Sequence, residues 1–173
     1  VVEGMDSILG IMDKEIRRPL ELWLKKNKVI VHTNALARGA KIKGKGASRK
    51  VELTFEKDSE EQKITVDKIL VTVGRSPNSK GWGVENMGIR MDTSGRFIRI
   101  DRQCRTSAPG VYAIGDVAGE PMLAHKASAQ GEMVAEIISG EKREFDKVAI
   151  PAIVFTEPEI VSVGMTPDEA KEK

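Results

Sequence analysis

Cysteine is almost absent from this 173-residue sequence, and Cys104 is the only one. A single cysteine excludes an internal disulfide, whether structural or catalytic. Long hydrophobic runs are also missing: none approaches the ~20 residues that cross a bilayer, and the first residues lack the basic and apolar regions of a signal peptide. The 28 basic and 26 acidic residues nearly balance, and no basic stripe alternates with aromatic residues, so nucleic-acid binding is not indicated. We therefore expect a globular, cytoplasmic protein.

The most informative stretch is VYAIGD at residues 111–116, followed by PMLAHKA at residues 121–127. Residues 111–114 predict a short buried strand, Gly115 lets a ligand approach the backbone, and Asp116 places a carboxylate at the end of the strand. Small and apolar residues recur every three or four positions over residues 124–138, which predicts a helix whose first amides point back toward Asp116. An acceptor beside a positive helix end suits a ligand that carries a polyol.

The first half of the chain predicts a strand, a helix and another strand, followed by a meander. The expected elements are a buried parallel strand ending at residues 1–3, an amphipathic helix at 13–26, a strand at 28–33, and short antiparallel strands from 36 to 73 with turns at 44–46 and 57–59. The last of these strands, at residues 68–73, is expected to be buried. Because Pro19 lies inside the helical pattern, we expect a kink or a late helix start there.

The second half contains fewer regular patterns. Residues 92–95 predict a hairpin turn, a new strand begins near residue 153, and Thr166 with Glu169 predicts the capped start of a helix. Cys104 could be a nucleophile, yet no histidine is near it in the sequence, so we interpret it as an incidental thiol. His32, inside a predicted strand, is likewise interpreted as structural.

Four separate motifs resemble those of one family. Residues 106–116 and 122–127 are similar to the second FAD-binding motif of the pyridine-nucleotide disulfide oxidoreductases, and in particular of the dihydrolipoamide dehydrogenases. The likeness continues through TVGRSPN at residues 72–78 and FTEPE at residues 155–159, in the order that the family shows. The resemblance implies an α/β fold of Rossmann-like FAD/NAD(P)-binding domains with an antiparallel β-meander, incomplete at both ends.

The same resemblance assigns residues to two cofactors, FAD and NAD. A carboxylate at the end of the first strand, Glu3, would take the adenosine ribose hydroxyls and favour NAD over NADP, although a solvated acid at a strand end is the plainer interpretation of that residue alone. Asp116 would bind a ribityl hydroxyl, and Lys126 would face away from the flavin. No metal site is predicted. The assigned residues are Glu3, Ala35 and Gly74 for NAD, and Gly115, Asp116, Met122, Leu123, Ala124 and His125 for FAD.

Three parts that the family uses are not found in this sequence: a cysteine pair, a glycine-rich FAD loop and a histidine–glutamate base. We therefore expect an internal fragment that contains no catalytic residue and is inactive alone. Its expected divisions are the C-terminal part of an NAD-binding domain at residues 1–75, a returning segment of the FAD-binding domain at 76–147, and the start of an interface (dimerisation) domain at 148–173. Arg75 is assigned only to the crossover between the first two.

The function implied for the full-length protein is reoxidation of protein-bound dihydrolipoamide by NAD, through FAD and a redox disulfide that lies outside this chain. The implied partners are the lipoyl domains and the acyltransferase core of a 2-oxo acid dehydrogenase complex, with the glycine cleavage complex as another host, and a second copy in a homodimer. Two alternatives stay open. One is a related flavoenzyme, such as mercuric reductase, glutathione reductase or soluble transhydrogenase; the other is a non-catalytic domain that binds a protein partner.

Overall fold

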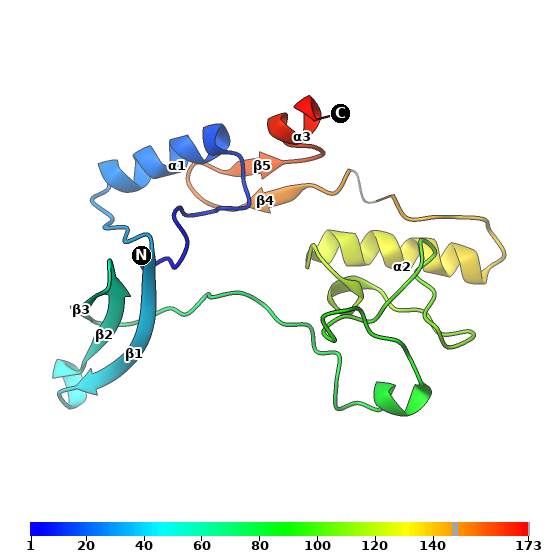
Figure 1. Cartoon of the computed structure of the whole chain (residues 1–173), viewed down its shortest axis with the longest axis horizontal. Helices are drawn as coiled ribbons and strands as arrows, with labels where there is room; N and C mark the ends of the chain where they lie inside the picture. Colours follow the sequence, from blue (N-terminus) through cyan, green and yellow to red (C-terminus); the bar gives the residue numbers. More distant parts are fainter. Residues whose placement is uncertain (147–148, 173) are drawn as a thin grey trace. The chain divides into compact units, whose positions relative to one another are not determined.

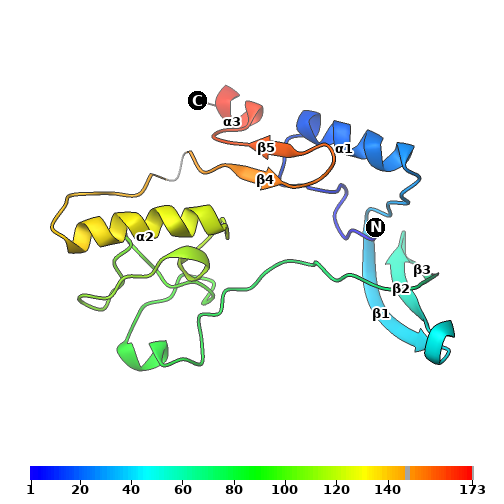
Figure 2. The same cartoon turned by 180° about the vertical axis from the view of Figure 1, so that it is seen from behind.

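The structure, a computed structural model, describes residues 1–146 and 149–172 and divides into two compact units (Figures 1 and 2). The first unit consists of Val1–Thr72 together with the chain from Pro151 onward, and the second is Val73–Ile150. Within the described residues, no helix combines the length and the apolar character that a membrane-spanning helix needs.

The first unit begins with a β-α-β arrangement. Val2 and His32 form a parallel bridge, and helix α1 (Lys14–Lys26) lies between them in the sequence. The Glu3 amide donates to the His32 carbonyl at 2.8 Å, and the His32 amide donates to the Val1 carbonyl at 2.9 Å. Parallel neighbours require a crossover of this kind, since a tight turn can join only antiparallel strands. The strands predicted at residues 1–3 and 28–33 are reduced to this one isolated bridge, which makes the two segments parallel neighbours.

Capping residues stabilise both ends of helix α1. The Asp13 carboxylate accepts the Glu15 amide at 2.8 Å, and Lys25 with Lys26 occupies the last turn, where the helix dipole favours positive charge. The helix therefore starts at Lys14 with Pro19 inside it, and the expected late start is wrong. A well-formed N-cap stabilises the first turn before the proline is reached.

The predicted meander is confirmed. Strands β1 (Ala35–Lys43), β2 (Lys50–Lys57) and β3 (Glu60–Val66) form an antiparallel sheet in the order β1-β2-β3. The short 3-10 helix η1 (Gly46–Ser48) lies in the first connection. In the second, Asp58 and Ser59 both have positive φ, as a two-residue hairpin requires. Phe55 of β2 is fully buried, and its ring lies 4.9 Å from that of His32, which confirms a structural place for that histidine.

The buried strand predicted at residues 68–73 is wrong. This segment has no regular secondary structure, and the side chains of Leu70 and Val73 are 87% and 91% exposed. An apolar run is buried as a strand only when neighbouring strands and a covering layer receive it. The described residues contain no strand that pairs with this segment, so its apolar composition alone does not make it a strand.

The second unit packs short segments around two small apolar clusters. The predicted hairpin turn is confirmed by the bridge between Met91 and Ile98. Hydrogen bonds from the Ser94 hydroxyl and from the amides of Phe97 and Arg96 lower the pKa of the Asp92 carboxyl at this turn. The unit also contains the 3-10 helices η2 (Val84–Met87) and η3 (Gly115–Ala118) and helix α2 (Ala124–Ile138).

The strand predicted at residues 111–114 is reduced to one isolated bridge, between Arg105 and Tyr112. Ala113 is buried, as expected, in the cluster that also contains Val84, Ile98 and Ala118. The second cluster packs Met133, Val134 and Ile137 of α2 against Cys104. The segment is therefore buried by side-chain packing, whereas a full strand would need a continuous ladder of hydrogen bonds to a neighbouring strand.

The last part of the chain forms a small hairpin and a short helix. Strands β4 (Ala152–Val154) and β5 (Ile160–Ser162) are antiparallel, and helix α3 (Pro167–Lys171) follows them. The Thr166 hydroxyl and the Glu169 carboxylate form the predicted capping box. The predicted start of the interface domain at Val148, with the neighbouring Lys147, lies outside the described residues, as does Lys173.

Candidate functional site

Gly115 lies where η3 meets the first half of α2. Its φ is +72°, and a Cβ built on it would lie 3.1 Å from the Cβ of Ala127. Its amide donates to the buried Gln130 side-chain oxygen at 2.8 Å. A glycine is therefore required by the backbone conformation and by the approach of the helix. The sequence predicted the glycine from ligand approach alone, and the helix contact is a second reason for it.

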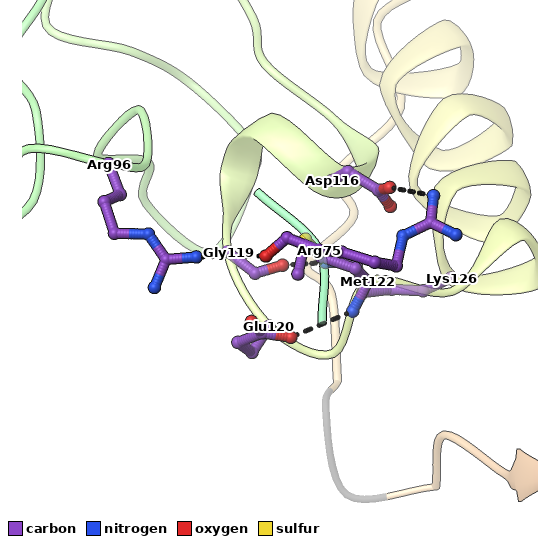
Figure 3. A network of polar contacts seen from close by, with 7 residues as sticks. All are labelled: Arg75, Arg96, Asp116, Gly119, Glu120, Met122 and Lys126. Atoms are coloured by element: carbon purple, nitrogen blue, oxygen red, sulfur yellow. Dashed lines mark hydrogen bonds and ion pairs between the residues drawn. The ribbon is translucent and has the colours of Figure 1, made fainter. Parts of the chain in front are cut away.

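Asp116 follows directly and its carboxylate is partly exposed. Arg75 Nη2 lies 3.1 Å from Asp116 Oδ2, with the two side chains 71% and 36% exposed (Figure 3). From the sequence, Arg75 is assigned only to the crossover. Nothing local could have paired it with a residue 41 positions away. The structure thus adds a cation to the predicted ribityl site.

The start of α2 has no side-chain cap. Leu123 is the N-cap residue, its side chain makes no capping bond, and the first turn contains no acidic residue. The Leu123 amide donates to the Pro121 carbonyl at 3.1 Å, and the Met122 amide to Glu120 Oε2 at 3.2 Å (Figure 3). The Ala124 amide has no acceptor within the described residues. Of the two amides expected to face a flavin, those of Leu123 and Ala124, only that of Ala124 is not already used within the chain. His125 lies exposed in the same turn.

Lys126 does not face solvent. Its side chain is only 3% exposed, and Nζ donates a hydrogen bond to the Gly119 carbonyl (Figure 3). Gln130, one helical turn later, is also buried. Neither residue was predicted to be buried, although their spacing gave a signal. Lys126, Gln130 and the buried Met133 and Ile137 follow one another at intervals of four, three and four residues, so all four share one face of α2. The polar residue types concealed that periodicity.

The two predicted adenosine-site residues meet in the first unit. The Ala35 amide donates to the Glu3 carbonyl at 2.9 Å, and Ala35 is buried. Glu3 Oε1 accepts the Met5 amide at 2.8 Å, so the carboxylate lies directly after the bridge that Val2 forms. Gly74 belongs to the second unit, with φ of +122°, and beyond its chain neighbours no described atom lies within 4 Å of the place that a Cβ would take. Their contacts to NAD stay predictions.

Two cavities, one in each unit, are lined by residues other than Asp116 and Glu3. A cavity of about 360 Å³ in the second unit is lined by Ile100, Asp101, Arg102, Cys104, Gln130, Phe145 and Asp146. One of about 340 Å³ in the first unit lies beside α1 and is lined in part by Asp6, Glu21 and Lys25. Neither cavity includes Asp116 or Glu3. Cys104 is fully buried among α2 side chains, which supports the interpretation of an incidental thiol. Within the described residues, no group of three or more potential ligands could hold a metal ion.

Sequence comparisons find one family and closely similar relatives. Residues 1–131 match the family model described as pyridine nucleotide-disulphide oxidoreductase. The chain is 44% identical over 172 residues to a dihydrolipoyl dehydrogenase of Pseudomonas aeruginosa, and 45% identical over 174 residues to one of Bacillus subtilis. These alignments cover 99% and 100% of the chain but 35% and 36% of the two relatives. The chain thus spans about a third of the length of the curated relatives it matches.

Solved structures of similar proteins support the fold. LpdA from Mycobacterium tuberculosis matches with a TM-score of 0.80 and 30% identity, over 98% of this chain and 35% of LpdA. The HOCl-induced flavoprotein disulfide reductase RclA from Escherichia coli, solved as a Cu(II) complex, matches with a TM-score of 0.82 and 25% identity, over 99% of this chain and 38% of RclA. With the β-α-β start and the antiparallel meander, these matches confirm the Rossmann-like α/β class.

Proposed function

The chain belongs to the pyridine nucleotide-disulphide oxidoreductase family, and from that premise we propose that the complete protein is an NAD-dependent dihydrolipoyl dehydrogenase that contains FAD. Its substrate would be dihydrolipoamide on the lipoyl domains of a 2-oxo acid dehydrogenase or glycine cleavage complex. Support comes from relatives of that name at 44% and 45% identity over nearly the whole chain. A homodimer, an acyltransferase core as partner and a cytoplasmic location belong to the same proposal.

The observation that carries the proposal is the pairing of Asp116 with an uncapped helix start. Gly115 brings η3 against Ala127, so the carboxylate of the next residue and the first turn of α2 belong to one corner of the second unit. A carboxylate accepts hydrogen bonds from hydroxyls, and an uncapped helix start donates them. These residues fit a ribityl-flavin, which offers hydroxyl donors beside ring acceptors.

The electrostatics of this corner favour a reducible ring. FAD, when bound, supplies the electron transfer between a dithiol and NAD. A helix N-terminus stabilises negative charge by roughly 0.3–1 kcal/mol when exposed and up to ~2 kcal/mol when partly buried. The Ala124 amide and the α2 dipole would act on charge that reduction places at the ring edge. Met122, Leu123 and His125 would shape that edge through their backbone.

The adenosine part of NAD would be bound by residues of the first unit. Glu3 would accept hydrogen bonds from the adenosine ribose hydroxyls, and the Ala35 backbone beside it would contact the adenine. The bond between the Ala35 amide and the Glu3 carbonyl supports this proposal because it keeps both residues at one strand end. A carboxylate there repels the 2′-phosphate of NADP. Gly74 would let the nicotinamide lie close to the backbone. The redox disulfide and the proton-accepting base would come from outside these 173 residues.

The test is a substrate comparison with the complete, FAD-loaded protein. We expect NADH formation from NAD and dihydrolipoamide, with little NADPH formation from NADP. The Glu3→Ala variant should raise the KM for NAD, whereas Asp6→Ala, which removes an exposed acid three residues further along, should leave it unchanged. Equal use of both nucleotides by the native protein would contradict the role of Glu3.

A second candidate is another flavoprotein disulfide reductase, the class named for RclA, which matches this chain with a TM-score of 0.82. The same purified protein should therefore be offered oxidised glutathione with NADPH, and Hg²⁺ with NADPH. Turnover of either, without turnover of dihydrolipoamide, would replace the dihydrolipoyl proposal by the alternative. A protein that binds neither FAD nor NAD would support a non-catalytic binding domain.

A further inference from the structure

The two oxygens of the Asp116 carboxylate differ in their contacts. Oδ2 lies 3.1 Å from Arg75 Nη2, whereas Oδ1 has no partner among residues 1–146 and 149–172 (Figure 3). This single charge-assisted hydrogen bond restricts the rotation of the Asp116 carboxylate. One oxygen is thereby fixed by the protein while the other stays available to a ligand.

The main chain at Arg75 is itself anchored. Arg96 Nη2 donates to the Arg75 carbonyl at 3.2 Å (Figure 3), and the Ser79 hydroxyl donates to the Arg96 carbonyl at 2.6 Å. Ser79 is buried, so the second bond is protected from competing water. The segment that carries Arg75 is thus attached at two points to the hairpin that contains Arg96. Although the Arg75 side chain is exposed, these hydrogen bonds fix the position of its main chain.

We infer that Arg75 is a positioning residue for Asp116: by holding Oδ2 it turns Oδ1 toward the ribityl hydroxyl of FAD. The inference rests on the proposed function, in which Asp116 binds that hydroxyl. Fixing an acceptor before the ligand arrives removes part of the conformational entropy that binding would otherwise cost. Arg75 therefore acts on FAD affinity through Asp116.

The test is a double-mutant cycle on the complete protein after removal of FAD, with the dissociation constant of added FAD measured by flavin fluorescence. Exposed ion pairs contribute little, so Arg75→Gln should weaken FAD binding by roughly two- to fivefold. In the Asp116→Asn background the same substitution should have no effect. Arg75→Lys, which keeps the charge and loses the planar fork, should give an intermediate constant.

The matched control is Arg102→Gln, in the same unit. The Arg102 side chain is 81% exposed and lies 3.4 Å from a Glu144 carboxylate oxygen, so it also forms an exposed ion pair. This variant should bind FAD as the native protein does. An equal loss in Arg102→Gln would overturn the inference, because it would reveal a general effect of positive charge.

The outcomes distinguish the ribityl contact of Asp116 from the positioning role of Arg75. If Asp116→Asn binds FAD as tightly as the native protein, both the proposed ribityl contact and the inference fail. If Asp116→Asn weakens binding but Arg75→Gln has no effect, or an effect that is the same in both backgrounds, only the inference fails. Unfolding temperatures of the FAD-free variants should match that of the native protein, since Arg75 is largely exposed.

Discussion

Three features of the structure coincide at Gly115. Its φ of +72° lies in the left-handed region, which a Cβ disfavours, and the helix leaves only 3.1 Å between that Cβ and Ala127. Its amide also meets the Gln130 side chain. The conformation, the close approach and the hydrogen bond all fall on the residue before Asp116, so the position of the carboxylate depends on this glycine.

We expect Gly115→Ala to lower the free energy of unfolding of the complete protein by about 1–3 kcal/mol, the usual cost of a strained backbone position. FAD binding should weaken with it because α2 must move away from η3. Thermal unfolding and FAD titration would measure the two effects. Gly131→Ala is the control: its Cβ would lie 3.5 Å from Ile114 Cδ1, an ordinary contact, inside α2.

Since alanine favours a helix over glycine, Gly131→Ala should raise the free energy of unfolding by roughly 0.5–1 kcal/mol. Changes of opposite sign in the free energy of unfolding would support the conclusion that the surroundings of Gly115 and Gly131 differ. A Gly115→Ala variant as stable as the native protein would show that η3 and α2 tolerate a wider separation, and the geometric explanation of this position would fail.

At the scale of elements, α1 contains a conflict between its caps and its interior. Asp13 and the basic last turn stabilise the helix, whereas Pro19 lacks the amide that would bond to the Glu15 carbonyl. The helix persists because Leu20 is buried and because its first turn is capped. Burial of Leu20 and the N-cap thus compensate for the hydrogen bond that Pro19 cannot make.

Replacing Pro19 by alanine should therefore raise the free energy of unfolding by about 2 kcal/mol, the ~3 kcal/mol cost of proline in a helix interior less the ~0.4–1 kcal/mol by which proline restricts the unfolded chain. Chemical denaturation of the complete protein would measure it. On the same helix, Asp13→Ala should lower stability by ~0.5–2 kcal/mol. A Pro19→Ala variant no more stable than the native protein would indicate that the proline is already accommodated by a local distortion.

Helix α2 shows how a polar face can be a buried face. Lys126 and Gln130 lie at the same spacing as Met133 and Ile137, and all four are buried. The lysine donates to the Gly119 carbonyl and the glutamine accepts from the Gly115 amide, so both side chains bond to the backbone at the two ends of η3. The element is thereby fixed to the segment that precedes it, which contains Asp116.

At the scale of the whole molecule, the 173 residues contain one cysteine, and it is buried. Dithiol oxidation through a protein disulfide needs two cysteines, so these residues alone lack an essential reactant. Large apolar side chains are also exposed in both units, among them Leu70, Val73 and Phe155. Exposed apolar segments favour association with other chains.

A polypeptide of residues 1–173 should therefore form no NADH from NAD and dihydrolipoamide, even with added FAD, while the complete protein does so under the same conditions. It should also elute as aggregates or oligomers in size-exclusion chromatography with light scattering. Replacing Leu70 and Val73 by serine should reduce that association, since it removes exposed apolar surface. Turnover of dihydrolipoamide by a monomeric 173-residue polypeptide would contradict the prediction that the redox disulfide lies outside these residues.

The sequence by itself determined the features that depend on near neighbours. The meander, the hairpin turn at Asp92, the capping box of α3 and the glycine–aspartate pair at residues 115–116 all follow from patterns within a few residues. Local propensity, capping and turn geometry act over such distances. It also showed, from one cysteine, that no redox pair lies within these residues.

Only the tertiary structure decided which distant residues meet. The pairing of Arg75 with Asp116 and the bond between Ala35 and Glu3 join positions that no local pattern connects. The same holds for the failed strand at residues 68–73, because burial of an apolar run depends on partners that the run does not specify. Contacts between remote positions are set by how the elements pack, and packing is a property of the folded chain.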